Sequence, residues 1–309
     1  MSSLSRRALL RSATMASIGG LVLSACSSDD TTDPSELASD EIDANQEIID
    51  AIRAAGFADL IADYQPIVAT FEVITGPGRR LQFGLLDETQ TPAIDRKVEI
   101  AIVRSGDLEV VQSTKDPLFY GEGLGLRGVY VVDTDLPSPA IHYLVVASDG
   151  HVGAAPIAVN SPENSQVVLP GQPVPVVASP TLADDQGLAE LCTRTPACSM
   201  HQTSLDTALQ TGSPVVLVIA TPKFCQTAVC SPVVDVVQEL ATSGDADNVT
   251  FIHAEVFSDA GNTPIQLVTD FGLPSEPWTF LIGSDGILVD RFDGPVVPSL
   301  LRDAVLGLS

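Results

Sequence analysis

Two cysteines, Cys225 and Cys230, lie with four residues between them in the stretch ATPKFCQTAVCSPVVDVV. The stretch follows a run of apolar, β-branched residues and leads into a segment with helical periodicity. A cysteine at the start of a helix meets free backbone N–H groups and the positive end of the helix dipole, which favour its thiolate. We therefore take Cys225 as the candidate nucleophile and Cys230 as the candidate resolving cysteine.

The spacing sets a geometric condition on a disulfide between these two cysteines. Residues five apart in a regular helix have Cα atoms separated by roughly 8.6 Å, which is more than a disulfide spans. Either Cys225 lies in the loop before the helix, or the first helical turn unwinds when the bond forms. The spacing favours a pair whose oxidation remodels the turn over a rigid structural staple.

A second group of candidate residues precedes the apolar run, in LCTRTPACSMHQTSLDTAL. Local spacing favours a disulfide between Cys192 and Cys198, which would close a proline-containing loop; exchange with the reactive pair is an alternative. Sulfur ligands with an imidazole are also what copper(I) prefers, so Cys192, Cys198, Met200 and His201 are candidate copper ligands. No other cofactor is expected. His253, within FIHAEV, is interpreted as a hydrogen-bonded core residue.

The N-terminus has the character of a targeting segment. SRRALLR precedes an apolar, small-residue stretch over 13–23 that is too short to span a bilayer as a mature helix. SRR with its following leucines resembles a twin-arginine export signal, and LSAC at 23–26 resembles a lipobox. The resemblance implies a signal peptide over 1–25, a lipid on Cys26 and anchoring to the outer face of a bacterial cytoplasmic membrane. An ordinary secretory peptide is the alternative.

The charge balance limits the possible partners. The chain has 15 lysines and arginines against 40 aspartates and glutamates. Three of the arginines and none of the acids lie in residues 1–25, so loss of this segment leaves 12 basic and 40 acidic residues, a net charge of −28. Such a chain repels nucleic acid and anionic headgroups. We expect no nucleic-acid partner, and a membrane attachment that depends on the lipid on Cys26.

The patterning divides the mature chain into distinct segments. Residues 26–41 are polar and acidic, which predicts a tether. Apolar residues then recur at helical intervals, which predicts an amphipathic helix within 42–65. Seven short β-rich runs separated by turn signals predict an immunoglobulin-like β-sandwich over 66–160, expected to be a spacer or docking module. Proline and glycine mark a linker at 161–180, and 181–309 has a mixed α/β pattern.

The C-terminal segment resembles the thioredoxin fold. The patterning predicts the order β-α-β-α-β-β-α. The elements are, in turn, VVLVIA, the valine-rich helix after Cys230, NVTFIHAEVF, TPIQLVTDFG, the hairpin WTFLIGSDGILVDRF and VPSLLRDAVLGL. GLPSEPWTFLIGSDGILVDRFDG is similar to the thioredoxin segment in which a cis-proline begins the strand facing the active site. The resemblance implies that Pro277 is this proline, that it lies beside Cys225, and that Glu276, Pro277 and Trp278 contact the substrate. A charged Glu276 would oppose a Cys225 thiolate.

The resemblance implies a lipid-anchored, extracytoplasmic thiol–disulfide oxidoreductase that acts on thiols or disulfides of exported proteins. Two alternatives stay open. The chain could be a copper carrier or assembly factor that uses a non-catalytic thioredoxin-like domain. TPKFCQTAVC is also similar to the active-site turn of peroxiredoxins of the bacterioferritin-comigratory type, which implies a peroxidase. The sequence departs from the peroxiredoxin pattern at two positions: Pro222 stands where a threonine is expected, and Trp278 stands where an arginine is expected.

Overall fold

The computed structural model describes residues 45–115, 117–121, 128–225, 229–259 and 263–308, all within one compact unit, Asp43–Ser309. The expected signal peptide, the lipidation site Cys26 and the acidic tether lie outside these ranges. Among the helices of the described residues, none combines the length and apolar character needed to cross a bilayer.

The first described element is a helix over residues 45–54, whose inner face packs on a β-sheet. Ala51 and Ile52 are buried there against residues such as Val145. The helix stops before Gly56, which has a φ of +86°, a conformation that glycine adopts without a steric penalty. Strand structure begins at Ile61, so the helix is shorter than the expected 42–65 segment.

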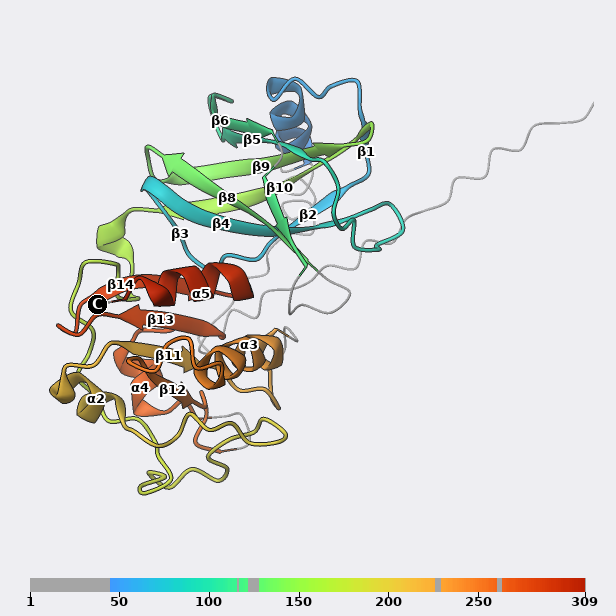
Figure 1. The fold of residues 1–309 in the computed structure, drawn as a ribbon. Coiled ribbons are helices and arrows are strands. Elements are labelled where there is room, and N and C mark those ends of the chain that lie inside the picture. The colour runs from blue at the N-terminus through green and yellow to red at the C-terminus, as the bar shows by residue number, and fades with distance from the viewer. Residues whose placement is uncertain (1–44, 116, 122–127, 226–228, 260–262, 309) are drawn as a thin grey trace, which may run out of the picture. The chain divides into compact units, whose positions relative to one another are not determined.

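Within the described part of residues 61–160, ten strands form two sheets (Figure 1). The strands are β1 (Ile61–Ala62), β2 (Gln65–Val68), β3 (Val73–Ile74), β4 (Gly76–Leu86), β5 (Glu99–Arg104), β6 (Val110–Lys115), β7 (Leu118–Tyr120), β8 (Val129–Leu136), β9 (Ala140–Ser148) and β10 (His151–Asn160). One sheet has the order β1-β10-β9-β5-β6, with β3 also paired to β10, and the other has the order β2-β4-β8-β7.

A shared apolar core joins the two sheets. Leu81 and Phe83 of β4 pack in one cluster with Ile100 and Ile102 of β5 and with Leu144 of β9, all of them 0–1% exposed. Alternate residues of each strand point to the same face, so the side of each strand that carries these residues faces the shared core. The predicted two-layer β-domain is thus present, built from more strands than the seven expected.

The segment expected as a linker at 161–180 is ordered against the C-terminal domain. It opens with a 3₁₀ helix, η1 (Pro162–Asn164), and continues without regular helix or strand. Val167 and Val174 are buried in the core of the C-terminal domain. The N–H of Gly171 donates to the Leu288 carbonyl at 2.8 Å. Apolar side chains and satisfied backbone groups therefore make this stretch part of the domain instead of a free spacer.

The C-terminal domain is built on a four-stranded mixed sheet in the order β12-β11-β13-β14. Its elements after the linker are α2 (Leu205–Thr211), β11 (Val215–Ile219), α3 (Cys230–Thr242), β12 (Thr250–Ala254), α4 (Gln266–Asp270), β13 (Trp278–Ile282), β14 (Leu288–Asp293) and α5 (Pro298–Leu306). β11 and β12 run parallel, whereas β13 is antiparallel to both β11 and β14. From β11 onward this is the predicted β-α-β-α-β-β-α order.

Helices cover both faces of this sheet, and the central strand shows why. All five residues of β11 are fully buried. Val216 and Val218 face a cluster that contains α3 and α5, whereas Leu217 and its alternate neighbours face a cluster that contains α2 and α4. A strand buried on both faces has a continuous apolar sequence, and β11 therefore lies at the centre of the domain.

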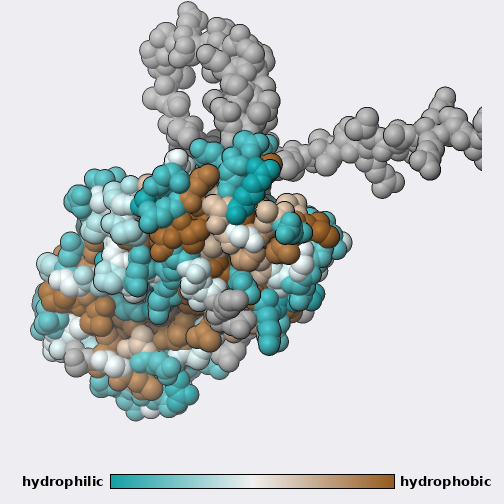
Figure 2. All heavy atoms as spheres, turned by 90° about the horizontal axis from the view of Figure 1, so that it is seen from above, coloured by the Kyte–Doolittle hydropathy of each residue, from teal (hydrophilic) through white to brown (hydrophobic). Residues whose placement is uncertain are grey.

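The molecular surface mixes polar and apolar side chains. On the face shown in Figure 2, hydrophilic residues in teal are interspersed with hydrophobic residues in brown. Large apolar side chains with more than half of their surface exposed include Ile61, Leu118, Val176 and Leu182. With 40 acidic residues in the chain, the high negative charge favours solubility of such a surface.

Candidate functional site

Cys225 and Cys230 form a disulfide between the end of β11 and the start of α3. Their Cα atoms are 6.0 Å apart, shorter than a regular helix allows for residues five apart. Cys230 is the first residue of α3 and Cys225 precedes the helix. The structure thus selects the first of the two arrangements that the sequence left open, in which Cys225 lies in the loop. Residues 226–228 between them are outside the described ranges.

The two sulfurs of this disulfide differ in burial. Cys225 is half-buried, whereas Cys230 is fully buried in the cluster beneath α3. Cys225, which also lines a pocket, is therefore the more accessible of the two cysteines, and access decides which sulfur of a disulfide is attacked. This asymmetry is compatible with Cys225 as the candidate nucleophile and Cys230 as the candidate resolving cysteine.

The cis peptide bond predicted before Pro277 is present, between Glu276 and Pro277. Pro277 directly precedes β13, and the first residue of β13, Trp278, pairs with Ile219 at the end of β11. This register brings Glu276 and Pro277 next to the turn that carries Cys225. The backbone N–H of Thr221 donates to a carboxylate oxygen of Glu276, which ties the two segments together.

Glu276 lies close to the disulfide. One carboxylate oxygen and the two sulfurs of Cys225 and Cys230 all lie within 4.8 Å of one another. Burial raises the pKa of the Glu276 carboxyl to about 7; Glu255 adds to the rise, and the Thr221 donor and His253 oppose it. A carboxyl that titrates near neutral pH can give or take the proton of a reacting thiol.

Trp278 does not lie at the substrate-facing surface. Its side chain is 0% exposed, its ring stacks on that of Phe280 with centroids 6.0 Å apart, and the guanidinium of Arg291 lies 5.2 Å from the ring centre. The prediction that Trp278 contacts the substrate is corrected, because its strand position turns the indole into the core.

A pocket of about 380 Å³ opens beside Cys225. It is lined mainly by apolar groups from the turn before α3, from the segments flanking α4 and from the stretch before β13. The lining residues are Phe224, Cys225, Val256, Phe257, Pro264, Val268, Leu273, Pro274, Ser275 and Glu276. The pocket is thus a concave, mainly apolar surface that carries the carboxyl of Glu276 beside Cys225.

The second pair of cysteines is not bonded. Cys192 and Cys198 are free thiols with sulfurs 3.8 Å apart, whereas a disulfide requires about 2.05 Å. The predicted second disulfide is therefore corrected. Both sulfurs face histidines: Cys198 Sγ lies 3.2 Å from His201 Nε2 and 3.3 Å from His253 Nδ1, and Cys192 Sγ lies 3.8 Å from His253 Nδ1.

The hydrogen bond between the two thiols shifts their pKa values in opposite directions. The interaction with Cys198 lowers the pKa of the Cys192 thiol, against the effect of burial, and His201 and His253 lower it further. The same bond, together with burial, raises the pKa of the Cys198 thiol. Cys192 is thus the more acidic of the two thiols.

His253 is the residue of this cluster that sequence reasoning missed. It lies on β12, fully buried, and its Nε2 is 2.9 Å from the carbonyl oxygen of Ala220. That contact agrees with the prediction of a hydrogen-bonded core residue, but the other ring nitrogen faces the two sulfurs. The available signal was a polar residue inside an apolar strand, which does not reveal what its side chain faces.

Met200 contributes to the core. Its side chain is 2% exposed and packs in the cluster that contains Val216 and Val218, and its backbone carbonyl accepts the N–H of His253. Of the four candidate copper ligands, the structure thus brings Cys192, Cys198 and His201 together and adds His253, while Met200 packs among valines.

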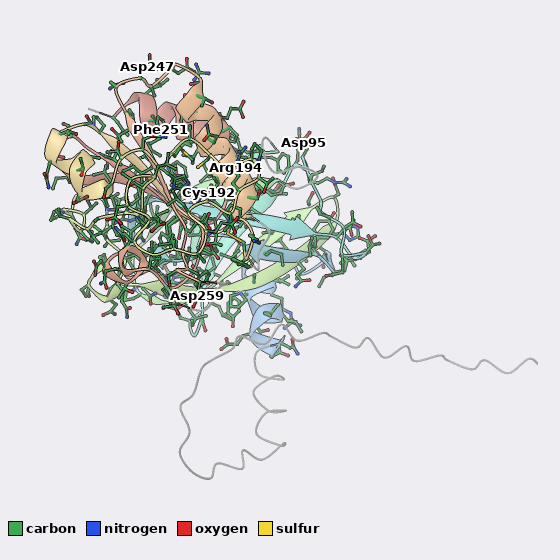
Figure 3. All side chains as sticks on the ribbon, turned by 90° about the horizontal axis from the view of Figure 1, so that it is seen from below. Asp95, Cys192, Arg194, Asp247, Phe251 and Asp259 are labelled. Carbon is green, nitrogen blue, oxygen red and sulfur yellow. A yellow bond between two sulfur atoms is a disulfide. The ribbon has the colours of Figure 1, made fainter. Side chains whose placement is uncertain are left out.

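The segment that carries Cys192 is tied to its surroundings at three points. Figure 3 labels Cys192 and Arg194 in this segment, and Arg194 Nε donates to Asp235 of α3 at 2.6 Å. Thr193 donates to the buried Glu255 through its hydroxyl at 3.0 Å and through its backbone N–H at 2.6 Å. The Thr193 hydroxyl oxygen also accepts the N–H of Lys223 at 3.2 Å, which links this segment to the turn before Cys225.

The strand order, a disulfide at the N-terminus of the first helix after β11 and the facing cis-Pro277 together define a thioredoxin-like fold for the C-terminal part of the chain. No protein-family model and no curated protein matches the chain. Among solved structures it is similar to StoA from Bacillus subtilis (16% identity, 37% of this chain and 94% of that chain, TM-score 0.28). It is also similar to a thio-disulfide isomerase from Thermus thermophilus (19%, 46% and 99%, TM-score 0.30).

The sulfur carrier protein SoxY from Chlorobium limicola f thiosulfatophilum is a further match, with 16% identity over 40% of this chain and 97% of that chain and a TM-score of 0.21. At these TM-scores the similarities carry no argument about activity. The assignment of the fold rests on the topology and on the residues described above.

Proposed function

We propose that this protein carries out thiol–disulfide exchange through Cys225 and Cys230. The observation that carries the proposal is the disulfide at the N-terminus of α3, with a half-buried outer sulfur and a fully buried inner one. Chemistry at such a pair needs an accessible sulfur to form the mixed disulfide and a protected one to resolve it. The neighbouring Glu276 carboxyl, whose pKa is raised to about 7, supports proton transfer at the same place.

The reaction is written from the oxidised form of the pair. A substrate thiolate attacks Cys225 Sγ, the bond between Cys225 and Cys230 breaks, and Cys230 leaves as a thiolate that takes a proton from Glu276. A second substrate thiolate then attacks the substrate sulfur of the mixed disulfide and releases Cys225. Two substrate thiols become one disulfide, and the protein disulfide becomes two thiols. The reverse sequence reduces a substrate disulfide.

The features around the pair support a polypeptide substrate. The apolar pocket beside Cys225 can hold a substrate side chain, and the backbone at Glu276 and Pro277 lies next to the turn that presents Cys225. We propose that this backbone aligns the substrate chain across the disulfide. With Trp278 buried, the substrate contact is assigned to Phe224, Glu276 and Pro277.

The cellular setting is proposed from the sequence. An export signal over 1–25 and a lipid on Cys26 would hold the protein on the outer face of the cytoplasmic membrane, where its substrates would be thiols or disulfides of other exported proteins. The two-sheet domain, which we propose to be of immunoglobulin-like type, would act as a spacer or docking module. The acidic composition supports neither a nucleic-acid partner nor adhesion to anionic lipid by charge.

The exchange reaction is tested with the oxidised full-length protein and a peptide that carries two thiols, with transfer of the disulfide followed by mass spectrometry. Cys225→Ser should lower the rate by at least about 100-fold, because the accessible sulfur is gone. Ser299→Ala, a remote substitution on α5, should leave the rate unchanged. An unchanged rate in Cys225→Ser would refute the proposed function.

A peroxidase is less well supported by the same site. Activation of a peroxide needs donors directed at the leaving oxygen. The hydroxyl oxygen of the buried Thr221 accepts the N–H of Val256 at 2.8 Å, and Trp278 lies in the core where an arginine is expected for a peroxidase. Rapid formation of a sulfenate on reduced Cys225 with hydrogen peroxide would reverse this ranking.

A further inference from the structure

We propose that Cys192, Cys198, His201 and His253 bind one zinc ion, at a site separate from the Cys225–Cys230 pair. The ligand atoms of these four residues all lie within 4.8 Å of one another. The proposal goes beyond thiol–disulfide exchange, since it assigns a second chemical site with its own ligand. It also replaces the copper hypothesis drawn from Met200 and its neighbours in the sequence.

The distances between the ligand atoms fit a tetrahedral zinc ion. Zn–S bonds of about 2.3 Å and Zn–N bonds of about 2.05 Å place tetrahedral ligands roughly 3.8 Å apart for two sulfurs and roughly 3.6 Å apart for a sulfur and a nitrogen. The two sulfurs are 3.8 Å apart, and three of the sulfur–nitrogen distances are 3.2, 3.3 and 3.8 Å. Four of the six distances between ligand atoms thus lie within about 0.4 Å of the tetrahedral values, and the other two are below 4.8 Å.

The orientation of His253 supports the same assignment. The contact of Nε2 with the Ala220 carbonyl, at 2.9 Å, requires a proton on Nε2 and leaves the lone pair of Nδ1 directed at the sulfurs. Histidines that bind metals commonly donate their other N–H to a carbonyl or carboxylate, which fixes the tautomer. The carboxylate of Glu255 lies 3.8 Å from the same Nε2 and completes an outer shell of this kind.

Charge favours zinc over copper(I). The cluster is enclosed: His201 is 3% exposed, His253 is 0% exposed, and both cysteines are half-buried. Zn²⁺ with two thiolates and two neutral imidazoles has no net charge, whereas Cu⁺ with the same ligands leaves one buried negative charge, which is costly in a low-dielectric interior. A tetrahedral set of two sulfurs and two nitrogens is also typical of zinc.

The origin of the ligands indicates a structural role. Three of them come from residues 192–201, which contain neither helix nor strand, and the fourth comes from β12 at the sheet. Four protein ligands leave no position for substrate, as in structural zinc sites. Binding releases the thiol protons, fastens the loop to β12 and keeps the two cysteines from forming a disulfide. Because Thr193 in this loop accepts the Lys223 N–H, the metal also braces the turn before Cys225.

The test uses the full-length protein, reduced and freed of metal, titrated with Zn²⁺ against a chromophoric chelator. We expect one equivalent of tightly bound zinc in addition to any weak surface binding. Replacement by Co²⁺ should give the visible bands of a tetrahedral ion and a thiolate-to-metal charge-transfer band in the near ultraviolet. Cys198→Ser should weaken binding by at least about 100-fold and reduce the charge-transfer band, because one thiolate is lost.

The matched control is the double variant Cys225→Ser/Cys230→Ser, which removes the other cysteine pair and must retain one equivalent of zinc. Loss of zinc in this control would move the site to the redox pair and overturn the proposal. A second measurement needs no variant. If zinc does not raise the melting temperature of the wild-type protein and a chelator does not lower it, the proposal is also overturned. Binding of Cu⁺ but not Zn²⁺, or a Cys192–Cys198 disulfide in the protein as exported, would equally refute it.

Discussion

At the scale of single residues, the proton chemistry of the redox site depends on Glu276. Its carboxyl lies within 4.8 Å of both sulfurs of the disulfide, and its ordinary pKa of 4.5 is raised to about 7, chiefly by burial. In the disulfide form the two cysteines do not titrate, and the charged neighbours that shift this pKa are Glu255 and His253. Near neutral pH the Glu276 carboxyl is thus present in both its protonated and its ionised form.

The raised pKa predicts a pH dependence of stability. Below about pH 4.5 the carboxyl is protonated in both folded and unfolded chains, and the full stability is present. As the pH rises toward 7, the unfolded chain loses this proton more readily than the folded one, so the free energy of unfolding falls. Glu276→Gln should show a smaller fall between about pH 5 and about pH 8 in urea titrations. Equal pH slopes in both proteins would contradict the assigned role of burial.

The same carboxyl should shape the pH profile of exchange. In the wild-type protein the rate of opening of the Cys225–Cys230 disulfide should change around pH 7, where Glu276 loses its proton. Glu276→Gln should lose this inflection and retain only the titration of the attacking thiol. Glu239→Gln, on the outer surface of α3, provides a charge-matched control that should keep the inflection.

At the scale of elements, β11 is the strand on which both apolar clusters of the C-terminal domain pack. Its residues alternate between two apolar clusters, one with α3 and α5 and the other with α2 and α4, and its C-terminal end leads into the turn with Cys225. Leu217, which is 0% exposed and paired with Phe280 of β13, lies in the second cluster. Removing its side chain leaves a cavity between the sheet and its helices.

Leu217→Ala should therefore lower the free energy of unfolding by about 2–5 kcal/mol. Val289→Ala on the edge strand β14, where the side chain is 51% exposed, should change it by less than about 0.5 kcal/mol. Denaturant unfolding followed by the fluorescence of Trp278, the single tryptophan of the chain, reports on this domain. Similar losses in both variants would contradict the central position of β11.

At the scale of the whole molecule, the net charge and the expected N-terminal signal both bear on attachment to a membrane. The mature chain expected from the signal would have a net charge of −28, so anionic lipid would repel it, and the proposed attachment would depend on acyl chains on Cys26. The full-length protein should stay with the membrane fraction in high salt, and Cys26→Ser should move it to the soluble fraction. Fractionation and immunoblotting check this outcome. A Cys26→Ser protein that stays on the membrane would contradict lipid anchoring.

The sequence by itself determined the order of the elements of the C-terminal domain from β11 onward and singled out Cys225 and Cys230 as the candidate pair. The apolar run of β11 and the valine face of α3 could be predicted because strand burial and helical periodicity depend on neighbouring residues. The cis-proline at 277 was implied by the resemblance to the thioredoxin segment. The sequence also limited Cys225 and Cys230 to two geometries, since helix dimensions are fixed. The structure chose between them by starting α3 at Cys230.

Only the tertiary structure decided what the second cysteine pair faces. His253 is 55 residues from Cys198 along the chain and reaches it because β12 pairs with β11 and the 192–201 loop folds over that edge. In the same way strand register turned Trp278 into the core and brought Glu276 to the disulfide. Contacts of this kind depend on which strands become neighbours, and local patterns of residue type contain no record of that pairing.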